Sequence, residues 1–148
     1  MWNRFPERTR REYHAHFTAK FHEYLDAGAG ACTLRQPAAA EIVAGALGFF
    51  DGQRYELGDF VAMPNHLHLL VTPLEAHELS DILQSWKRHT AREINKLSAR
   101  RGTFWQAESF NHIVRSEAQL DRFRRYIAEN PAKARLREGE YLHWVRPT

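Results

Sequence analysis

Two histidines one residue apart are the clearest candidate for chemistry in the sequence. His66 and His68 lie in a segment whose polar and apolar residues are typical of a strand. Side chains two residues apart in a strand project from the same face, so both imidazoles point one way while Leu67, Leu69 and Val71 point into the core. Two neighbouring imidazoles can supply two nitrogen ligands to a divalent cation, with oxygen ligands to complete the site. Two half-exposed histidines that bind no metal are the alternative.

A tyrosine in the second half of the chain is the next candidate. Tyr126 and Asn130 are four residues apart on a predicted amphipathic helix, so a phenol and an amide oxygen emerge side by side. Arg124 and Arg125 precede the tyrosine and are expected to give it a positive environment that favours the phenolate and attracts a phosphate. A tyrosine at the edge of the core is the alternative interpretation.

Other catalytic patterns are weaker. His14 and His16 repeat the histidine spacing, but they follow a charged arm and are interpreted as surface or core-edge residues. A two-histidine phosphoesterase needs a second copy of the His16-Phe17-Thr18 pattern, which is absent. Cys32 lies in an alanine-rich loop with no local partner, and the sequence has no Gly-x-Ser-x-Gly elbow or phosphate-binding glycine-rich loop. Serine and cysteine nucleophiles are therefore set aside.

Positive charge is concentrated in the second half of the chain. Residues 82–148 carry 14 lysines and arginines against 7 acidic residues, whereas residues 1–81 carry 7 against 11. A one-sided excess fits a nucleic-acid partner, because bound lysine and arginine release counterions from the phosphates; a solvated helix face is the alternative. The candidate DNA contacts are an N-terminal arm, the cations of a long helix, a base-stacking indole and the two arginines before the tyrosine: Arg4, Arg8, Arg10, Arg11, Lys87, Arg88, Arg92, Lys96, Trp105, Arg124 and Arg125. For Trp105, a place in the core is the alternative interpretation.

The elements that must position these residues follow from hydrophobic periodicity. It predicts strands at 13–22, 55–63, 66–72 and 109–115, and helices at 37–50, 79–101 and 117–130. Pro64 and Asn65 form a turn short enough to make the second and third strands an antiparallel hairpin. Ser116 and Gln119 have the spacing of a capping box, and the helix they begin is expected to end before Pro131. This order predicts an α+β, ferredoxin-like sandwich, with an antiparallel sheet, two helices on one face, the other face available for a site, and an extra C-terminal helix that carries the tyrosine.

Length and composition fit one domain. The 148 residues suit a single unit over 1–148, with residues 1–12 as a basic arm. The longest apolar stretch, residues 42–50, is far shorter than the roughly 20 residues that span a bilayer. The first residues lack the hydrophobic run of a secretory signal, and the single cysteine fits a reducing compartment. We therefore expect a cytoplasmic protein with no membrane partner.

Five motifs taken together resemble the REP-associated tyrosine transposases, a branch of the IS200-like single-tyrosine HUH transposases. They are Met63–Val71, Lys87–Ala91, Phe104–Gln106, Ile113–Arg115 and Tyr126–Ala134, within a match that extends over residues 55–136. The histidine pair alone is a weak signal, but five motifs in the family's order and at family-like spacing are highly specific. Asn111 and Arg135 depart from the family pattern, in which Asp and Gly are common at these positions, and this bears on DNA specificity rather than on chemistry.

The resemblance implies a ferredoxin-like fold and a divalent metal, Mg²⁺ or Mn²⁺, held by His66, His68 and Asn130. It also implies that Tyr126 is the nucleophile of a metal-dependent enzyme that cleaves and transfers single-stranded DNA through a 5′-phosphotyrosine intermediate. The expected partner is hairpin-forming, REP-like single-stranded DNA in the nucleoid, bound by a monomer or a homodimer. Two alternatives remain: a catalytically silent protein that binds structured single strands, and a phosphoesterase that uses water and does not need Tyr126.

Overall fold

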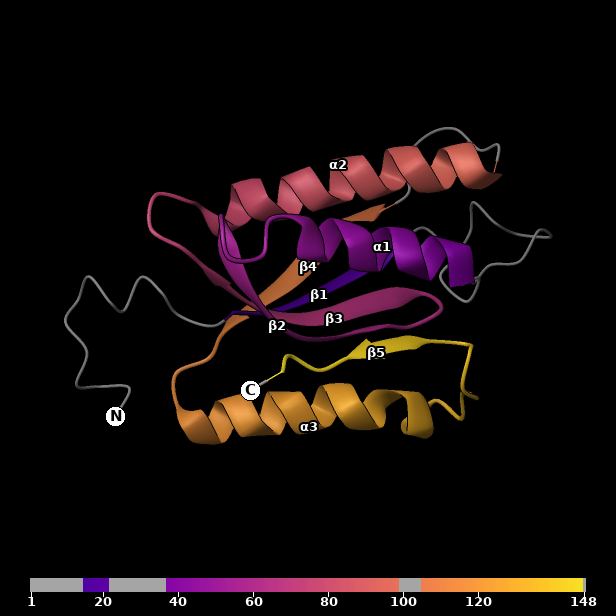
Figure 1. Ribbon diagram of the computed structural model, residues 1–148. Helices are drawn as coiled ribbons and strands as arrows, with labels where there is room; N and C mark the ends of the chain where they lie inside the picture. Colours follow the sequence, from indigo (N-terminus) through magenta and orange to yellow (C-terminus); the bar gives the residue numbers. More distant parts are fainter. Residues whose placement is uncertain (1–14, 22–36, 99–104, 148) are drawn as a thin grey trace.

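A computed structural model of the protein describes residues 15–21, 37–98 and 105–147 (Figure 1). Its elements, in chain order, are β1 (Ala15–Phe21), α1 (Pro37–Phe49), β2 (Tyr55–Ala62), β3 (His66–Pro73), α2 (Leu79–Ser98), β4 (Trp105–Ile113), α3 (Glu117–Lys133) and β5 (Leu142–Trp144). The predicted basic arm with Arg4, Arg8, Arg10 and Arg11 lies outside the described residues. None of the helices in these ranges is long and apolar enough to cross a membrane.

The sheet has five strands in the order β4-β1-β3-β2-β5, and every neighbouring pair is antiparallel. The predicted α+β, ferredoxin-like architecture is confirmed, with β3 at the centre of the sheet. The fifth strand was not predicted from the sequence. It pairs with β2, and Trp144 stacks on Phe60 with 5.6 Å between ring centroids. A strand of three residues is too short to show a two-residue period in the sequence.

Helices cover both faces of the sheet. Figure 1 shows α1 and α2 on one face and α3 on the other. The side chains of β3 divide between the two: Leu67, Leu69 and Val71 pack with α1 and α2, whereas Leu70 packs with Ile127 of α3. The face that was expected to be available for a site is therefore partly covered by the helix that carries the candidate tyrosine.

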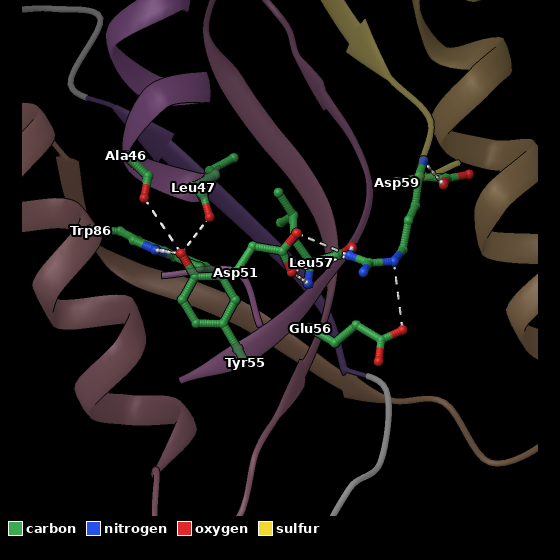
Figure 2. A network of polar contacts seen from close by, with 9 residues as sticks. Ala46, Leu47, Asp51, Tyr55, Glu56, Leu57, Asp59 and Trp86 are labelled. Carbon is green, nitrogen blue, oxygen red and sulfur yellow. Dashed lines mark hydrogen bonds and ion pairs between the residues drawn. The ribbon is translucent and has the colours of Figure 1, made fainter. Parts of the chain in front are cut away.

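A chain of buried hydrogen bonds joins α1, β2, α2 and β4. The hydroxyl of Tyr55 donates to the carbonyl of Leu47 and accepts from Nε1 of Trp86 at 3.0 Å (Figure 2). The hydroxyl of Thr90 donates to the carbonyl of Trp86 at 2.7 Å and accepts from Nε1 of Trp105 at 2.8 Å. Both indole N–H groups thus have an acceptor inside the core, which removes the cost of burying an unpaired donor.

α3 begins where the sequence predicts and ends later. The hydroxyl of Ser116 accepts from the backbone N–H of Gln119 at 3.1 Å, and the side chain of Gln119 accepts from the backbone one residue before the cap at 2.7 Å. The predicted end at Asn130 is wrong, because the helix continues through Pro131 to Lys133. A proline in the last turn lacks one backbone hydrogen bond, and the burial of this proline ring offsets that loss.

Replacing Tyr55 with Phe should lower the free energy of unfolding by about 1–3 kcal/mol, because the Trp86 indole loses its buried acceptor. Urea unfolding followed by circular dichroism measures the change. Adding Trp86→Phe removes the orphaned donor and serves as the control, so the two substitutions together should cost less than the sum of their separate costs. A Tyr55→Phe variant as stable as the wild type would contradict the assignment.

Burial raises the pKa of Tyr55 above its ordinary value of 10.0. The folded protein therefore holds this proton more tightly than the unfolded chain does. Stability is retained below pH 10.0 and falls as the pH rises through the raised pKa. Urea midpoints measured on both sides of that pH should fall less in Tyr55→Phe than in the wild type. An equal fall of the urea midpoint in Tyr55→Phe and in the wild type would contradict this prediction.

Candidate active site

β3 places His66 and His68 on the same face of the sheet, as predicted. Their ring centroids are 4.6 Å apart and their planes are nearly perpendicular. His68 is only 5% exposed, so the pair combines a buried imidazole with a half-buried one. Asn65, in the turn between β2 and β3, has its Oδ1 2.5 Å from Nδ1 of His66. The neutral tautomer that donates from Nδ1 to this oxygen keeps its lone pair on Nε2, the form that binds a metal.

α3 places Tyr126 against this pair. The ring centroids of His68 and Tyr126 are 5.3 Å apart, and the planes meet at 87°. The next residue, Ile127, is fully buried against Val61 and Leu70 and anchors the helix on this face. Tyr126 therefore lies at the edge of the contact and remains 41% exposed. A phenol packed on an imidazole and still open to solvent can approach a phosphate group of a ligand.

Asn130 lies one turn after Tyr126 on the same flank of α3. Its Nδ2 is 3.4 Å from the carbonyl of Tyr126, so the amide oxygen is the atom suited to bind a cation. Among the described residues, no three His, Cys, Asp or Glu side chains gather to hold a metal. The donor set predicted from the sequence for a divalent cation is two imidazoles and this amide. Two nitrogens and one oxygen suit Mn²⁺ better than Mg²⁺, which prefers oxygen ligands.

The cation beside Tyr126 was not among the predicted site residues. Nζ of Lys133 is 5.8 Å from the centroid of the Tyr126 ring and 3.9 Å from Oε2 of Glu129. Residues 126, 130 and 133 share one flank of a helix, and extending the predicted helix past Asn130 would have identified this lysine. Its charge is placed to attract a phosphate that approaches the tyrosine.

The two arginines expected around Tyr126 behave differently. Nε of Arg124 is 3.4 Å from Oδ2 of Asp59 on β2, and Asp59 is 4% exposed. The prediction that Arg124 provides the positive environment of the tyrosine is corrected, because its charge is directed at this buried carboxylate. Arg125 is exposed on α3 and has its guanidinium available to an anionic ligand.

The basic residues of α2 lie on the opposite face of the sheet from α3 (Figure 1). Arg88, Arg92 and Lys96 are exposed, and the last two both pair with Glu93, at 3.6 and 3.7 Å. Lys87 is half-buried, and this burial lowers its pKa. The structure therefore does not bring these cations together with the candidate nucleophile.

Trp105 is a core residue. It is 6% exposed, packs with the core under α2 and donates its indole N–H to Thr90. The prediction that Trp105 stacks on a DNA base is wrong, because stacking requires an exposed ring face. The sequence could not decide between stacking on a base and packing in the core, since the acceptor lies fifteen residues earlier on a different element.

Comparison with known proteins gives one family. The model of the family described as "Transposase IS200 like" matches residues 38–130, more than half of the chain. A solved structure described as a REP-associated tyrosine transposase bound to a REP hairpin has a TM-score of 0.63 and 18% identity, covering 83% of this chain and 68% of that one. A candidate transposase from Deinococcus radiodurans has a TM-score of 0.54 and 19% identity, covering 78% of this chain and 88% of that one. At these identities the two structures support the fold. No curated protein matches the chain.

The metal-free protein should bind Mn²⁺, and His66→Ala and His68→Ala should each weaken binding by roughly tenfold or more, because each removes one nitrogen donor. Isothermal titration calorimetry without DNA measures this. His89→Ala is the matched control, since His89 is exposed on α2 on the other face of the sheet. Unchanged Mn²⁺ binding in both His66→Ala and His68→Ala would exclude the site. Mn²⁺ binding that is weakened as much in His89→Ala would also exclude it.

Proposed function

The chain belongs to the IS200-like transposase family, and from that membership we propose that it cuts and rejoins single-stranded DNA through a covalent bond to Tyr126. The family supplies the class of activity, which is DNA transposition. The observation that best supports the specific chemistry is the contact of Tyr126 with His68, at 5.3 Å between ring centroids, within one chain. A nucleophile and a pair of metal ligands are the two parts that phosphoryl transfer needs.

The residues have separate roles in this proposal. His66, His68 and the amide oxygen of Asn130 would hold the divalent cation. Such an ion, when bound, offsets the charge on the non-bridging oxygens of the scissile phosphate. The hydroxyl oxygen of Tyr126 attacks phosphorus in line, so a bond from Tyr126 to phosphorus forms as the bond to the 3′ oxygen breaks. The tyrosine proton passes by way of solvent to the 3′ oxygen, and the products are a 5′-phosphotyrosyl strand and a 3′-hydroxyl end.

The same site can run the reaction in reverse. One phosphodiester replaces another at cleavage, so the bond to Tyr126 retains the free energy needed for joining. Attack by the 3′-hydroxyl of a second strand breaks the bond between phosphorus and Tyr126 and returns the proton to the tyrosine. Cutting and strand transfer are then one reaction in two directions, and neither requires a nucleotide cofactor.

The surface around α3 fits a DNA strand. Exposed cations lie along this helix and directly after it: Arg122, Arg125, Lys133, Arg135 and Arg137. Contacts of this kind bind phosphates without reading sequence. One structural relative is described as bound to a REP hairpin. We extend this to the present chain and propose hairpin-forming repeat DNA as its substrate.

The test uses single-stranded hairpin oligonucleotides from the repeats that flank the gene, labelled at the 5′ or the 3′ end and incubated with Mn²⁺ or with EDTA. On a denaturing protein gel, only the 3′-labelled strand should give a labelled adduct, because Tyr126 retains the downstream fragment. The adduct should require Mn²⁺ and disappear in Tyr126→Phe. Tyr141→Phe, a tyrosine before β5, is the matched control and should form the adduct normally.

Two other results would each identify a different function. Tight hairpin binding without an adduct under any divalent metal would indicate a catalytically silent DNA-binding protein. Metal-dependent cleavage that survives Tyr126→Phe would exclude the covalent mechanism and indicate a phosphoesterase that uses water.

A further inference from the structure

β2 contains a β-bulge at Gly58 and Asp59. Three steps along β2, from Leu57 to Phe60, lie opposite only two steps along β3. Leu57 and Phe60 both pack with α1 and α2, although residues three apart in a regular strand face opposite ways. The extra residue therefore turns the side chains of Asp59 and Val61 toward α3.

A glycine makes this bulge possible. A Cβ atom on Gly58 would lie 2.9 Å from Cβ of Leu70 and 3.1 Å from the carbonyl oxygen of Leu70. Any larger residue would push the two strands apart at the point where the bulge is needed. The position of Asp59 is thus fixed by the backbone and not by its own contacts alone.

The carboxylate of Asp59 has a partner on each side. Its Oδ1 accepts from the backbone N–H of Arg146 at 3.0 Å, and its Oδ2 lies 3.4 Å from Nε of Arg124. The side chain of Arg146 binds both carboxylate oxygens of Asp51 at 3.1 Å and the carbonyl of Leu57 at 2.7 Å, in the network around Asp51, Leu57 and Asp59 in Figure 2. One oxygen of Asp59 is therefore anchored to the segment after β5, and the other reaches α3.

Arg124 and Tyr126 lie on opposite flanks of α3. Residues two apart in a helix are separated by about 200° around its axis, and the buried Ile127 lies between these two flanks. A roll of the helix that lifts Arg124 from the sheet moves Tyr126 toward it, and the opposite roll moves Tyr126 away. The contact between Arg124 and Asp59 is therefore in a position to set the roll of α3.

We propose that Asp59 is a positioning residue for the nucleophile: its buried carboxylate, aimed at α3 by the bulge, holds Arg124 and sets the roll at which Tyr126 meets His68. The inference rests on the proposed function, because it assigns a role in presenting Tyr126 to DNA. Asp59 acts through α3 and not on the reacting atoms. Arg124, which the sequence suggested as a DNA contact, is in this view part of the support for the tyrosine.

Asp59→Asn keeps an oxygen for the N–H of Arg146 and removes the charge that holds Arg124. The rate of adduct formation should fall roughly 10- to 100-fold, because small displacements of a reacting group have effects of this size. The hairpin dissociation constant, from fluorescence anisotropy, should stay the same. Arg124→Gln should produce the same fall, and the double variant should fall no further. Asp51→Asn, which breaks one of the two ion pairs of the Arg146 side chain and leaves both contacts of Asp59 in place, is the matched control and should keep the wild-type rate.

The positioning role would be overturned if the adduct rate of the double variant fell by the product of the two single effects. Weaker hairpin binding in Arg124→Gln would overturn it as well, and would identify Arg124 as a DNA contact. A normal adduct rate in Asp59→Asn would also overturn it. If Asp59→Asn does not fold, Arg124→Gln carries the test, since it leaves the contact between Asp59 and the segment after β5 intact.

A second readout needs neither metal nor DNA. In protein with ¹³C-labelled tyrosine rings, the Tyr126 signal is assigned by its loss in Tyr126→Phe, and its cross-peak to His68 reports the ring contact. Asp59→Asn and Arg124→Gln should shift this signal and weaken the cross-peak, and Asp51→Asn should not. Unchanged spectra would overturn the positioning role. A wild-type protein that forms no adduct but shows these shifts would instead contradict the proposed function alone.

Discussion

Seven of the eight residues of β3 are buried, so a polar side chain on this strand needs a partner within the protein. His68 packs between two rings, that of His66 on its own strand and that of Tyr126 on α3. The same burial holds the imidazole in one orientation. Candidate metal ligands on a central, fully paired strand are rigid before any ligand arrives, which is the arrangement that catalysis favours.

The two faces of the sheet are stabilised differently. Under α1 and α2 lies a large core whose aromatic residues are joined by the hydrogen bonds through Tyr55, Trp86 and Thr90. Among the described residues, the buried core under α3 is smaller and includes Ile127. The scaffold that fixes the histidines is therefore the more stable layer, and the helix that carries the nucleophile belongs to the weaker one. Elements that move during function are commonly found in such weaker layers.

Short-range patterns in the sequence were sufficient for much of this arrangement. The common face of His66 and His68 follows from the two-residue period of a strand, and the start of α3 follows from the spacing of Ser116 and Gln119. The contact between Asp59 and Arg124 could not be predicted. The two residues are far apart in the chain, and a regular strand would point Asp59 to the wrong face. One extra residue in a strand reverses every later side chain, and hydrophobic periodicity does not locate it reliably.

Long-range partners explain the other differences. Trp105 is an aromatic residue of the kind that stacks on bases, and its burial and its hydrogen bond to Thr90 on a separate helix show that it belongs to the core. The prediction for α3 stopped before Pro131, because a proline usually marks the end of a helix. In the last turn of α3, the missing backbone N–H of Pro131 costs little stability, and the ring of Pro131 is buried. The predicted helix ended before this turn, so the prediction did not include Lys133 on the flank of α3 that carries Tyr126.

The sheet also separates two cationic surfaces, one on α2 and one along α3 (Figure 1). Double-stranded DNA has a persistence length of about 150 base pairs and resists a sharp turn around the edge of a small domain. A single strand has no such stiffness and can follow the surface from one face to the other. A nucleic acid that uses both surfaces must therefore be rigid where it is paired and flexible where it approaches Tyr126. Under the proposed function, this distribution of charge would favour a junction between stem and single strand, through mechanics and without reading any base.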